Sequence, residues 1–160
     1  MPESTNTQPT EGSVAPDFTL PTASGEPFRL STAQGKPVVV YFYPKDDTPG
    51  CTVEAKGFEA LREAFDEAGA LVVGISPDGT ASHCKFAEKY GLGFVLASDE
   101  DHRTAEAYGV WVEKSMYGKK SWGVQRATFL IDSAGRVAKA WPKVKPEGHA
   151  EEVLEAVKAL

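Results

Sequence analysis

The chain has 160 residues and a formal net charge of −6, which is the length of one compact domain and too short for two ordinary ones. With 41% hydrophobic and 10% aromatic residues it can bury a core, and its two cysteines exclude a disulfide scaffold. The acidic balance excludes a phosphate-tracking nucleic-acid binder, no apolar run is long enough to cross a membrane, and no Cys-x-x-Cys metal spacing is present.

The first 13 residues, MPESTNTQPTEGS, are polar and lack both the basic residues and the apolar run of a signal peptide. We therefore expect a flexible N-terminal tail at residues 1–13, a single domain at residues 14–160 and a cytoplasmic location. A reducing compartment makes a functional cysteine more often catalytic than structural.

The first patterned segments predict strands. Residues 17–20 and 27–30 alternate apolar and polar side chains around Ser24-Gly25, which predicts a short hairpin. Residues 38–43, Val-Val-Val-Tyr-Phe-Tyr, show no polar alternation. Such a run predicts a central strand covered on both faces, with helices on each side of the sheet.

After a loop at residues 45–50, apolar residues recur at helical spacing, at Phe58, Leu61, Phe65 and Ala68. This pattern predicts an amphipathic helix that stops at Gly69. Gly57 inside it costs about 1 kcal/mol relative to Ala, so we expect close packing or movement there.

The rest of the chain continues the alternation. The predicted elements are a strand at 71–75, a helix at 79–90, a strand at 94–97, a short helix at 101–108, a hairpin of 124–131 with 136–141, and a final helix at 147–160. This order predicts an α/β sandwich with a central mixed sheet flanked by helices. The basic cluster at 114–120 is interpreted as a solvated loop.

The most informative segment carries Cys51, which follows a strand and loop at the first turn of a helix. Ligand sites lie outside the carboxyl ends of sheet strands, and the free N–H groups and partial positive charge of a helix N-terminus stabilise a thiolate. Thr48 can turn its hydroxyl to the same pocket, while Pro44 and Pro49 fix the loop. The alternative is a helix cap with a buried, inert thiol.

The stretch from Phe42-Tyr43-Pro44 to Cys51-Thr52-Val53-Glu54-Ala55 resembles the peroxiredoxin signature Pro-x-x-x-Thr/Ser-x-x-Cys. Its residues Lys45-Asp-Asp-Thr-Pro-Gly-Cys51 are similar to those of the Q-type (bacterioferritin comigratory protein) subfamily. The resemblance runs from about Ala15 to Leu160. Its other motifs follow in family order: Ala15-Pro-Asp-Phe18, Ser98-Asp-Glu-Asp-His102, Tyr108-Gly-Val and Gln125 to Asp132.

The resemblance implies a thioredoxin-like fold and reduction of hydrogen peroxide or organic hydroperoxides, without a metal or organic cofactor. Cys51 matches the peroxidatic cysteine, which becomes a sulfenic acid. Thr48 matches the residue that holds the peroxide oxygens, Pro44 the residue that shields the site, and Arg126 the arginine that completes it. Fixed donors would stabilise the charge that develops on the leaving oxygen.

The second cysteine departs from the commonest family pattern. Lys56 occupies the position five residues after Cys51 where many Q-type members carry a resolving cysteine. Cys84, on the next predicted helix, is the other thiol, although family members that resolve from this helix place theirs nearer Ala87. We predict a redox-active disulfide between Cys51 and Cys84, and a one-cysteine enzyme remains the alternative.

The histidines and tryptophans are interpreted as structural or solvent-exposed residues. His83 is interpreted as a surface residue, and His102 and His149 as solvated residues near helix starts. The three tryptophans are typical of cores and interfaces, with Trp122 close enough in sequence to Arg126 to border its pocket.

Two rival functions stay open. A dithiol oxidoreductase would need a second cysteine near Cys51, and an interaction module would carry slow-reacting thiols. The resemblance implies a hydroperoxide substrate, a thioredoxin-type reductant and a monomer.

Overall fold

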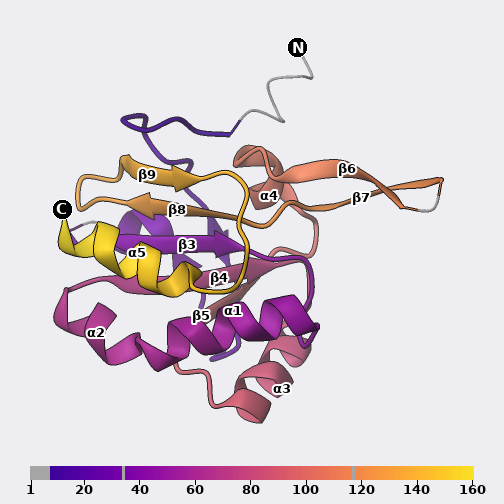
Figure 1. Cartoon of the computed structure of the whole chain (residues 1–160), viewed down its shortest axis with the longest axis horizontal. Coiled ribbons are helices and arrows are strands. Elements are labelled where there is room, and N and C mark those ends of the chain that lie inside the picture. The colour runs from indigo at the N-terminus through magenta and orange to yellow at the C-terminus, as the bar shows by residue number, and fades with distance from the viewer. Residues whose placement is uncertain (1–7, 34, 117) are drawn as a thin grey trace.

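The computed structural model describes residues 8–33, 35–116 and 118–160. A five-stranded sheet in the order β5-β4-β3-β8-β9 forms the centre of the fold (Figure 1). Its strands are β3 (Val38–Phe42), β4 (Leu71–Ser76), β5 (Val95–Ser98), β8 (Ala127–Ile131) and β9 (Val137–Trp141). β3, β4 and β5 are parallel, whereas β8 is antiparallel to both β3 and β9. The predicted mixed sheet with a buried central strand at residues 38–43 is therefore confirmed.

Among the described residues, four helices cover one face of the sheet. They are α1 (Pro49–Ala60), α2 (Arg62–Glu67), α3 (Thr80–Tyr90) and α5 (His149–Lys158). Their apolar side chains form one core cluster with Val39, Tyr41 and Tyr43, the alternate positions of β3 and the segment that follows it. This face of the sheet positions Cys51.

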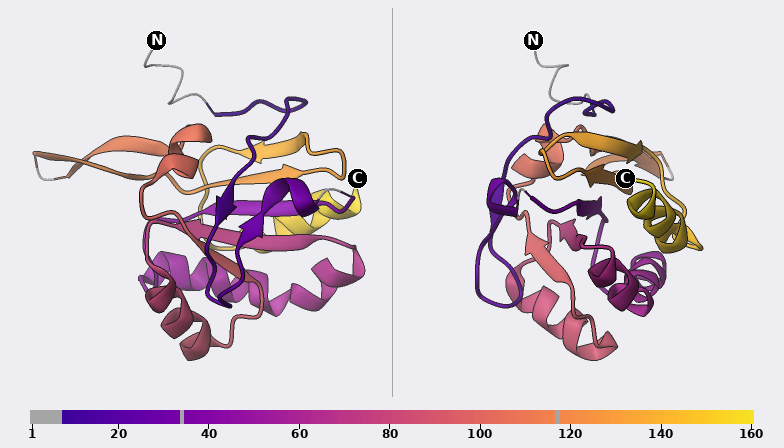
Figure 2. Two further views of the ribbon diagram at one scale, coloured as in Figure 1. Left: turned by 180° about the vertical axis from the view of Figure 1, so that it is seen from behind. Right: turned by 90° about the vertical axis from the view of Figure 1, so that its left-hand side faces the viewer.

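The opposite face is covered mainly by the N-terminal part of the chain, as the view from behind shows (Figure 2). The predicted hairpin is present as β1 (Thr19–Leu20) and β2 (Phe28–Arg29), followed by the 3-10 helix η2 (Leu30–Ala33). Together with α4 (Arg103–Ala107) these segments pack on Val38, Val40 and Phe42. The two faces of β3 thus contact two separate apolar clusters.

The predicted helix after the Cys51 loop is divided in two. α1 ends at Ala60 and α2 begins at Arg62, because Leu61 leaves the helical conformation with φ −104° and ψ 9°. Gly69, at φ +78°, follows α2 as predicted. A Cβ on Gly57 would lie 3.4 Å from the Cβ of Ala150 on α5, an ordinary van der Waals distance. The helices α1 and α5 are in contact here with room for a methyl group, and the expected close packing or movement at this glycine stays a prediction.

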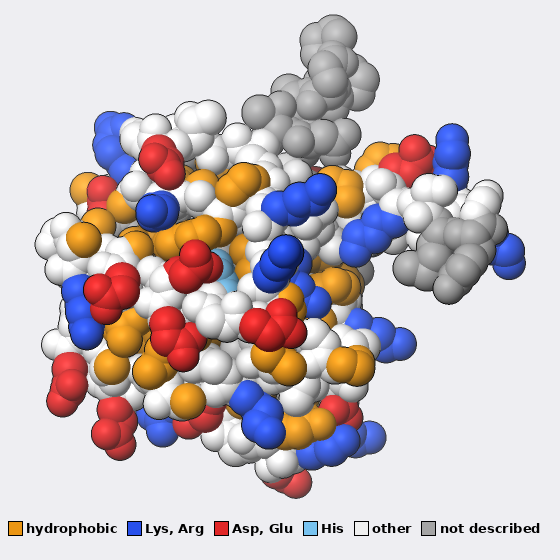
Figure 3. All heavy atoms as spheres, viewed as in Figure 1, with side chains coloured by type: hydrophobic (Ala, Val, Ile, Leu, Met, Phe, Trp, Pro, Cys, Tyr) orange, Lys and Arg blue, Asp and Glu red, His pale blue; other side chains and the backbone are white. Residues whose placement is uncertain are grey.

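The interpretation of residues 114–120 as a solvated loop is wrong. The segment belongs to a hairpin of β6 (Trp111–Met116) and β7 (Lys119–Val124), which projects from the body of the molecule (Figure 1). Most of the β7 side chains are exposed, and blue Lys and Arg side chains lie on the projection in Figure 3. A strand with polar side chains on both faces lacks the alternation by which strands are recognised. Tyr117 lies outside the described residues.

Part of the predicted tail pairs with the sheet. Residues 1–7 lie outside the described residues, but Gly12 N–H donates to Val137 O at 2.7 Å and Val137 N–H to Ser13 O at 2.9 Å. Val14 forms a bridge with Arg136. The division into a tail and one domain of residues 14–160 stays a prediction. Within the described part of the chain, no helix is long and apolar enough to cross a membrane.

Candidate active site

Cys51 lies where the chain leaves the central strand. β3 ends at Phe42, the loop of residues 44–48 follows, and α1 begins at Pro49, so Cys51 occupies the first helical turn, as predicted. Its side chain is 1% exposed. The N–H groups of a first turn have no partners within the helix, and their partial positive charge stabilises an anion at this place. The position suits a thiolate in a closed pocket.

Arg126 approaches Cys51 from the start of β8, the strand that lies next to β3 on the side opposite β4. It lies between β7 and β8, and the pairing of Ala127 with Phe42 places it beside the end of β3. Arg126 Nη2 donates to Cys51 Sγ at 3.4 Å. Although burial opposes the charge, Glu54 and Cys51 raise the pKa of Arg126. The two residues are 75 positions apart, and sheet pairing brings them together.

Glu54 fixes the arginine, and sequence reasoning did not give it a role. Arg126 Nη1 donates to Glu54 Oε1 at 2.7 Å, and Glu54 is 1% exposed. Burial raises the pKa of this carboxyl to about 7, although Arg126 opposes the rise. Its Oε2 has no hydrogen-bond partner in the described part of the chain. The sequence did contain a signal for this role: Glu54 lies three residues after Cys51, and residues i and i+3 share a helix face.

Gly50 provides the space for this contact. A Cβ at this position would lie 3.1 Å from Arg126 Nη2 and 3.5 Å from Pro146 Cγ. Carbon atoms rarely approach so closely, so a larger residue would displace the guanidinium. The absence of a side chain at Gly50 lets Arg126 reach the sulfur.

Thr48 and Pro44 line the loop before Cys51, both half-buried. Thr48 is the N-cap residue of α1, but its side chain does not cap the helix. Its Oγ1 donates to Lys45 O at 2.9 Å, which leaves the oxygen lone pairs free to accept a hydrogen bond. Among the described residues, no hydrogen bond joins either side chain to the Cys51 sulfur. Their roles in the site remain predictions.

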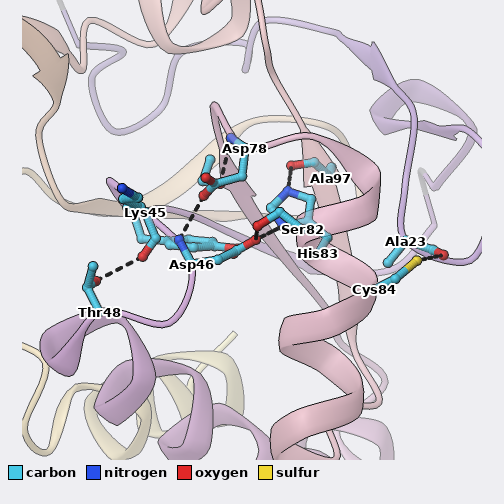
Figure 4. A network of polar contacts seen from close by, with 11 residues as sticks. Ala23, Lys45, Asp46, Thr48, Asp78, Ser82, His83, Cys84 and Ala97 are labelled. Atoms are coloured by element: carbon cyan, nitrogen blue, oxygen red, sulfur yellow. Dashed lines mark hydrogen bonds and ion pairs between the residues drawn. The ribbon is translucent and has the colours of Figure 1, made fainter.

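Cys84 is not beside Cys51. It lies on α3 with an exposed side chain, and its Sγ donates to Ala23 O at 3.0 Å. Figure 4 shows this sulfur on the side of α3 that faces away from Thr48 and its loop. Both cysteines are free thiols. A disulfide between them requires the intervening segments to move.

The interpretations of His83 and His149 as exposed are wrong. His83 is 0% exposed, with Nδ1 2.7 Å from Asp46 Oδ2 and Nε2 3.0 Å from Ala97 O. His149 is 1% exposed and lies 2.8 Å from Thr128 Oγ1 through Nε2. The sheet and the Cys51 loop supply the polar partners that make burial possible, and such partners are distant in sequence.

The remaining aromatic candidates lie away from the cysteine contacts. The side chain of His102 is 37% exposed, and its ring stacks on that of Trp111 with centroids 4.0 Å apart. Trp122 is 53% exposed on the projecting hairpin, and Trp141 packs edge-on against His149. Within the described ranges, no group of three or more His, Cys, Asp and Glu side chains could hold a metal ion.

Comparison with known proteins gives consistent matches. The family model for AhpC/TSA matches residues 12–140. Peroxiredoxin Bcp of Bacillus subtilis is 48% identical over 149 residues, covering 93% of this chain and 95% of the relative. The structure of a Xylella fastidiosa PrxQ variant matches with a TM-score of 0.90 at 38% identity, covering 96% of this chain and 98% of its own.

A further solved structure is the Xanthomonas campestris bacterioferritin comigratory protein, from work on its alkyl peroxide reduction activity with trapped intermediate and ligand complexes. It matches with a TM-score of 0.88 at 44% identity, covering 94% of this chain and 98% of its own.

Proposed function

The chain belongs to the AhpC/TSA family as a peroxiredoxin of the Bcp, or Q, type, and we propose that Cys51 is the cysteine that reacts with peroxide. The protein is a thiol peroxidase with the predicted thioredoxin-like α/β fold. The observation that carries the assignment of Cys51 is the 3.4 Å contact between its sulfur and the Arg126 guanidinium. Cys84 has no such cationic contact among the described residues.

In the first step, the Cys51 thiolate attacks one oxygen of the hydroperoxide. An S–O bond forms, the O–O bond breaks, and the leaving oxygen takes a proton and departs as water or an alcohol. Cys51 becomes a sulfenic acid. Arg126 is placed to stabilise the negative charge that develops during this displacement.

Thr48 and Pro44 complete the pocket in this proposal. Because the Thr48 hydroxyl donates to Lys45 O, it is oriented to accept the O–H of a hydroperoxide, which holds the substrate for attack. Pro44 has no backbone N–H, so its half-buried ring limits the access of water to the thiolate.

In the second step, the Cys84 sulfur attacks the sulfenic sulfur. An S–S bond forms, the S–O bond breaks, and the hydroxyl group leaves as water with the proton of the Cys84 thiol. A thioredoxin-type dithiol then supplies two electrons and two protons, which regenerates both thiols as the reductant becomes a disulfide. The alternative is a one-cysteine enzyme, in which an external thiol attacks the sulfenic acid.

The setting that suits this chemistry is a reducing compartment. Such a compartment, typically the cytoplasm, keeps thiols reduced, and we place the enzyme there as a monomer. Acidic and basic side chains are interspersed on the face drawn in Figure 3, with a net charge of −6, so we expect no nucleic-acid partner.

Peptide mapping tests the pairing of the cysteines. The reduced protein receives one equivalent of hydrogen peroxide, is alkylated and is digested. We expect one intramolecular Cys51–Cys84 disulfide, which thioredoxin with its reductase removes. Recovery of Cys51 as a sulfenic acid or an intermolecular adduct, with Cys84 reduced, would support the one-cysteine route.

A further inference from the structure

A buried aspartate joins the loop that precedes Cys51 (residues 44–48) to α3, the helix that carries Cys84. Asp46 is 7% exposed. Its Oδ2 accepts hydrogen bonds from Ser82 Oγ and His83 Nδ1, each at 2.7 Å, and its Oδ1 accepts one from Tyr43 Oη at 2.6 Å. Figure 4 shows Asp46, Ser82 and His83 meeting between the loop and the first turns of α3.

The backbone of the same loop is held to the end of β4. Asp46 N–H donates to Asp78 Oδ2 at 2.7 Å, and Ser76 Oγ donates to the same oxygen at 2.8 Å. Both the side chain and the main chain of Asp46 are therefore fixed by segments that lie far from it in sequence.

The next residue, Asp47, binds the other end of α3. Its Oδ2 accepts from Lys89 Nζ at 2.8 Å, and its Oδ1 accepts from Tyr90 Oη at 2.7 Å. Asp47 has a φ of +59°, a strained conformation for a residue with a side chain, although Asp tolerates it better than most. Two adjacent aspartates thus tie the loop to both ends of one helix, and one of them is held under strain.

Both ring nitrogens of His83 contact oxygen atoms of other segments. Ala97 O can only accept a hydrogen bond, so Nε2 carries a proton. Although burial opposes ionisation, hydrogen bonds from His83 and Tyr43 hold the pKa of Asp46 below its usual value. His83 Nδ1 lies 2.7 Å from Asp46 Oδ2, so the buried ring bridges the loop to β5.

The contacts of Asp46 and Asp47 with α3 oppose the second chemical step, in which Cys84 forms a disulfide with Cys51. Cys51 is buried at the start of α1, whereas Cys84 lies exposed on α3 and contacts Ala23. The Cys84 sulfur lies on the side of α3 turned away from Thr48 and its loop (Figure 4). A disulfide requires close approach of the two residues, so the loop and α3 must separate or unwind before the sulfurs meet. The bonds of Asp46 and Asp47 to α3 are the polar contacts that such a movement breaks.

We propose that Asp46 and His83, assisted by Asp47, are positioning residues that hold oxidised Cys51 in its pocket and set the rate of disulfide formation. The inference rests on the proposed function, because it presupposes that Cys51 is oxidised and that Cys84 resolves it. While this junction (the contacts of Asp46, Asp47 and His83 between the loop and α3) stays closed, a second peroxide can transfer an oxygen to the sulfenic sulfur, which gives a sulfinic acid and leaves water or an alcohol. The strength of the junction therefore also sets the sensitivity to excess peroxide.

Two substitutions at one position separate this role from a general structural one. In His83→Gln the amide nitrogen can reach Ala97 O but not Asp46, whereas in His83→Asn it can reach Asp46 but not Ala97 O. Both variants lose the imidazole ring. Loss of a hydrogen bond to a charged group corresponds to about tenfold or more, so disulfide formation should be about tenfold faster in His83→Gln and only a few-fold faster in His83→Asn.

The readouts are rapid quenching with mass spectrometry, for the rate of disulfide formation, and the peroxide concentration that converts half of Cys51 to sulfinic acid. We expect this concentration to rise in His83→Gln in proportion to the faster disulfide step. Consumption of the first equivalent of peroxide should stay within about threefold of the wild type, because His83 does not contact Cys51.

Asp47→Asn provides an independent variant that keeps the tolerated backbone conformation and loses the ion pair. The matched control is Asp17→Asn, since Asp17 and Asp47 have equally exposed side chains (43%) and each pairs with one exposed cation. Surface pairs contribute little, so we expect disulfide formation to be about two- to fivefold faster in Asp47→Asn and unchanged in Asp17→Asn.

If the wild type forms the Cys51–Cys84 disulfide and neither His83→Gln nor Asp47→Asn changes its rate, the inference is overturned while the proposed function stands. Equal acceleration in His83→Gln and His83→Asn would also overturn it, because general loosening of α3 would then account for both. Absence of the disulfide in the wild type would overturn the two proposals together.

Discussion

Arg126 Nη2 lies 3.4 Å from the sulfur of Cys51, and the two residues are 75 positions apart. The contact depends on the pairing of β3 with β8, which sets Ala127 opposite Phe42, and on Glu54, which holds the other nitrogen of the guanidinium. A cation fixed in this way is already in place when the peroxide bond breaks, so no reorganisation is needed during the reaction.

Replacement of Arg126 by Ala should lower the second-order rate with hydrogen peroxide by about 100-fold, the usual cost of removing one donor to developing negative charge. Arg126→Lys should give an intermediate rate, because the charge remains but the two-nitrogen fork is lost. The control is Arg103→Ala, since the Arg103 side chain is 85% exposed. An unchanged rate in Arg126→Ala would mean that another cation activates Cys51.

Gly50→Ala should reduce the peroxide rate by about tenfold or less without lowering the free energy of unfolding. The added Cβ, 3.1 Å from Arg126 Nη2, displaces the guanidinium by a few tenths of an ångström, and a 1 Å displacement costs roughly 100-fold. Gly57→Ala is the matched control in the same helix, because its Cβ would meet only Ala150 at 3.4 Å. It should keep the wild-type rate, and equal rate losses in both variants would contradict the role of Gly50.

Glu54 should make stability depend on pH near neutrality. Its folded pKa of about 7 exceeds the ordinary 4.5, so between these values the folded state holds a proton that the unfolded state has lost. Stability from this group is complete below pH 4.5 and falls as pH rises to 7. The shift corresponds to about 3 kcal/mol.

Urea unfolding of wild type and Glu54→Gln at pH 5 and pH 8 measures this effect. The amide can still accept from Arg126, and both proteins share the titration of His149, whose pKa is lowered by burial. We expect Glu54→Gln to gain stability relative to the wild type as pH rises. A difference that is the same at both pH values would show that Glu54 is ionised throughout.

Thr48→Val should lower the rate with peroxide by roughly three- to tenfold, the cost of one hydrogen bond, because valine keeps the shape and loses the hydroxyl. Thr48→Ser should remain close to the wild type. The comparison of the two initial rates isolates the oxygen atom from the volume of the side chain. Equal rates in Thr48→Val and wild type would exclude the hydroxyl from peroxide binding.

The sequence predicted the parts of the fold that depend on local pattern. The uninterrupted apolar run from Val38 marked the central strand, and helical spacing from Phe58 marked the segment after the Cys51 loop. The division between α1 and α2 at Leu61 leaves that spacing intact, so the spacing could not predict it. The hairpin of β6 and β7 was missed because its exposed strand carries polar side chains on both faces.

The candidate site was only partly predictable. Cys51 follows from its position in the first turn of the helix that comes after the central strand. Arg126 came from the family resemblance, because its partners are set by strand pairing. His83 was misread for the same reason. Its acceptors, Asp46 and Ala97 O, lie on other elements, and nothing in Ser82-His83-Cys84-Lys85 indicates that they are near.

The most direct test of the account is the number of equivalents of peroxide that the reduced protein consumes without any external reductant. Stopped-flow mixing with hydrogen peroxide should show a rapid phase of one equivalent in the wild type and in Cys84→Ser, because each retains the Cys51 sulfur and its contact with Arg126. Cys51→Ser should consume none. Rapid consumption of one equivalent by Cys51→Ser would contradict the assignment of Cys51 and, with it, the role given to Arg126.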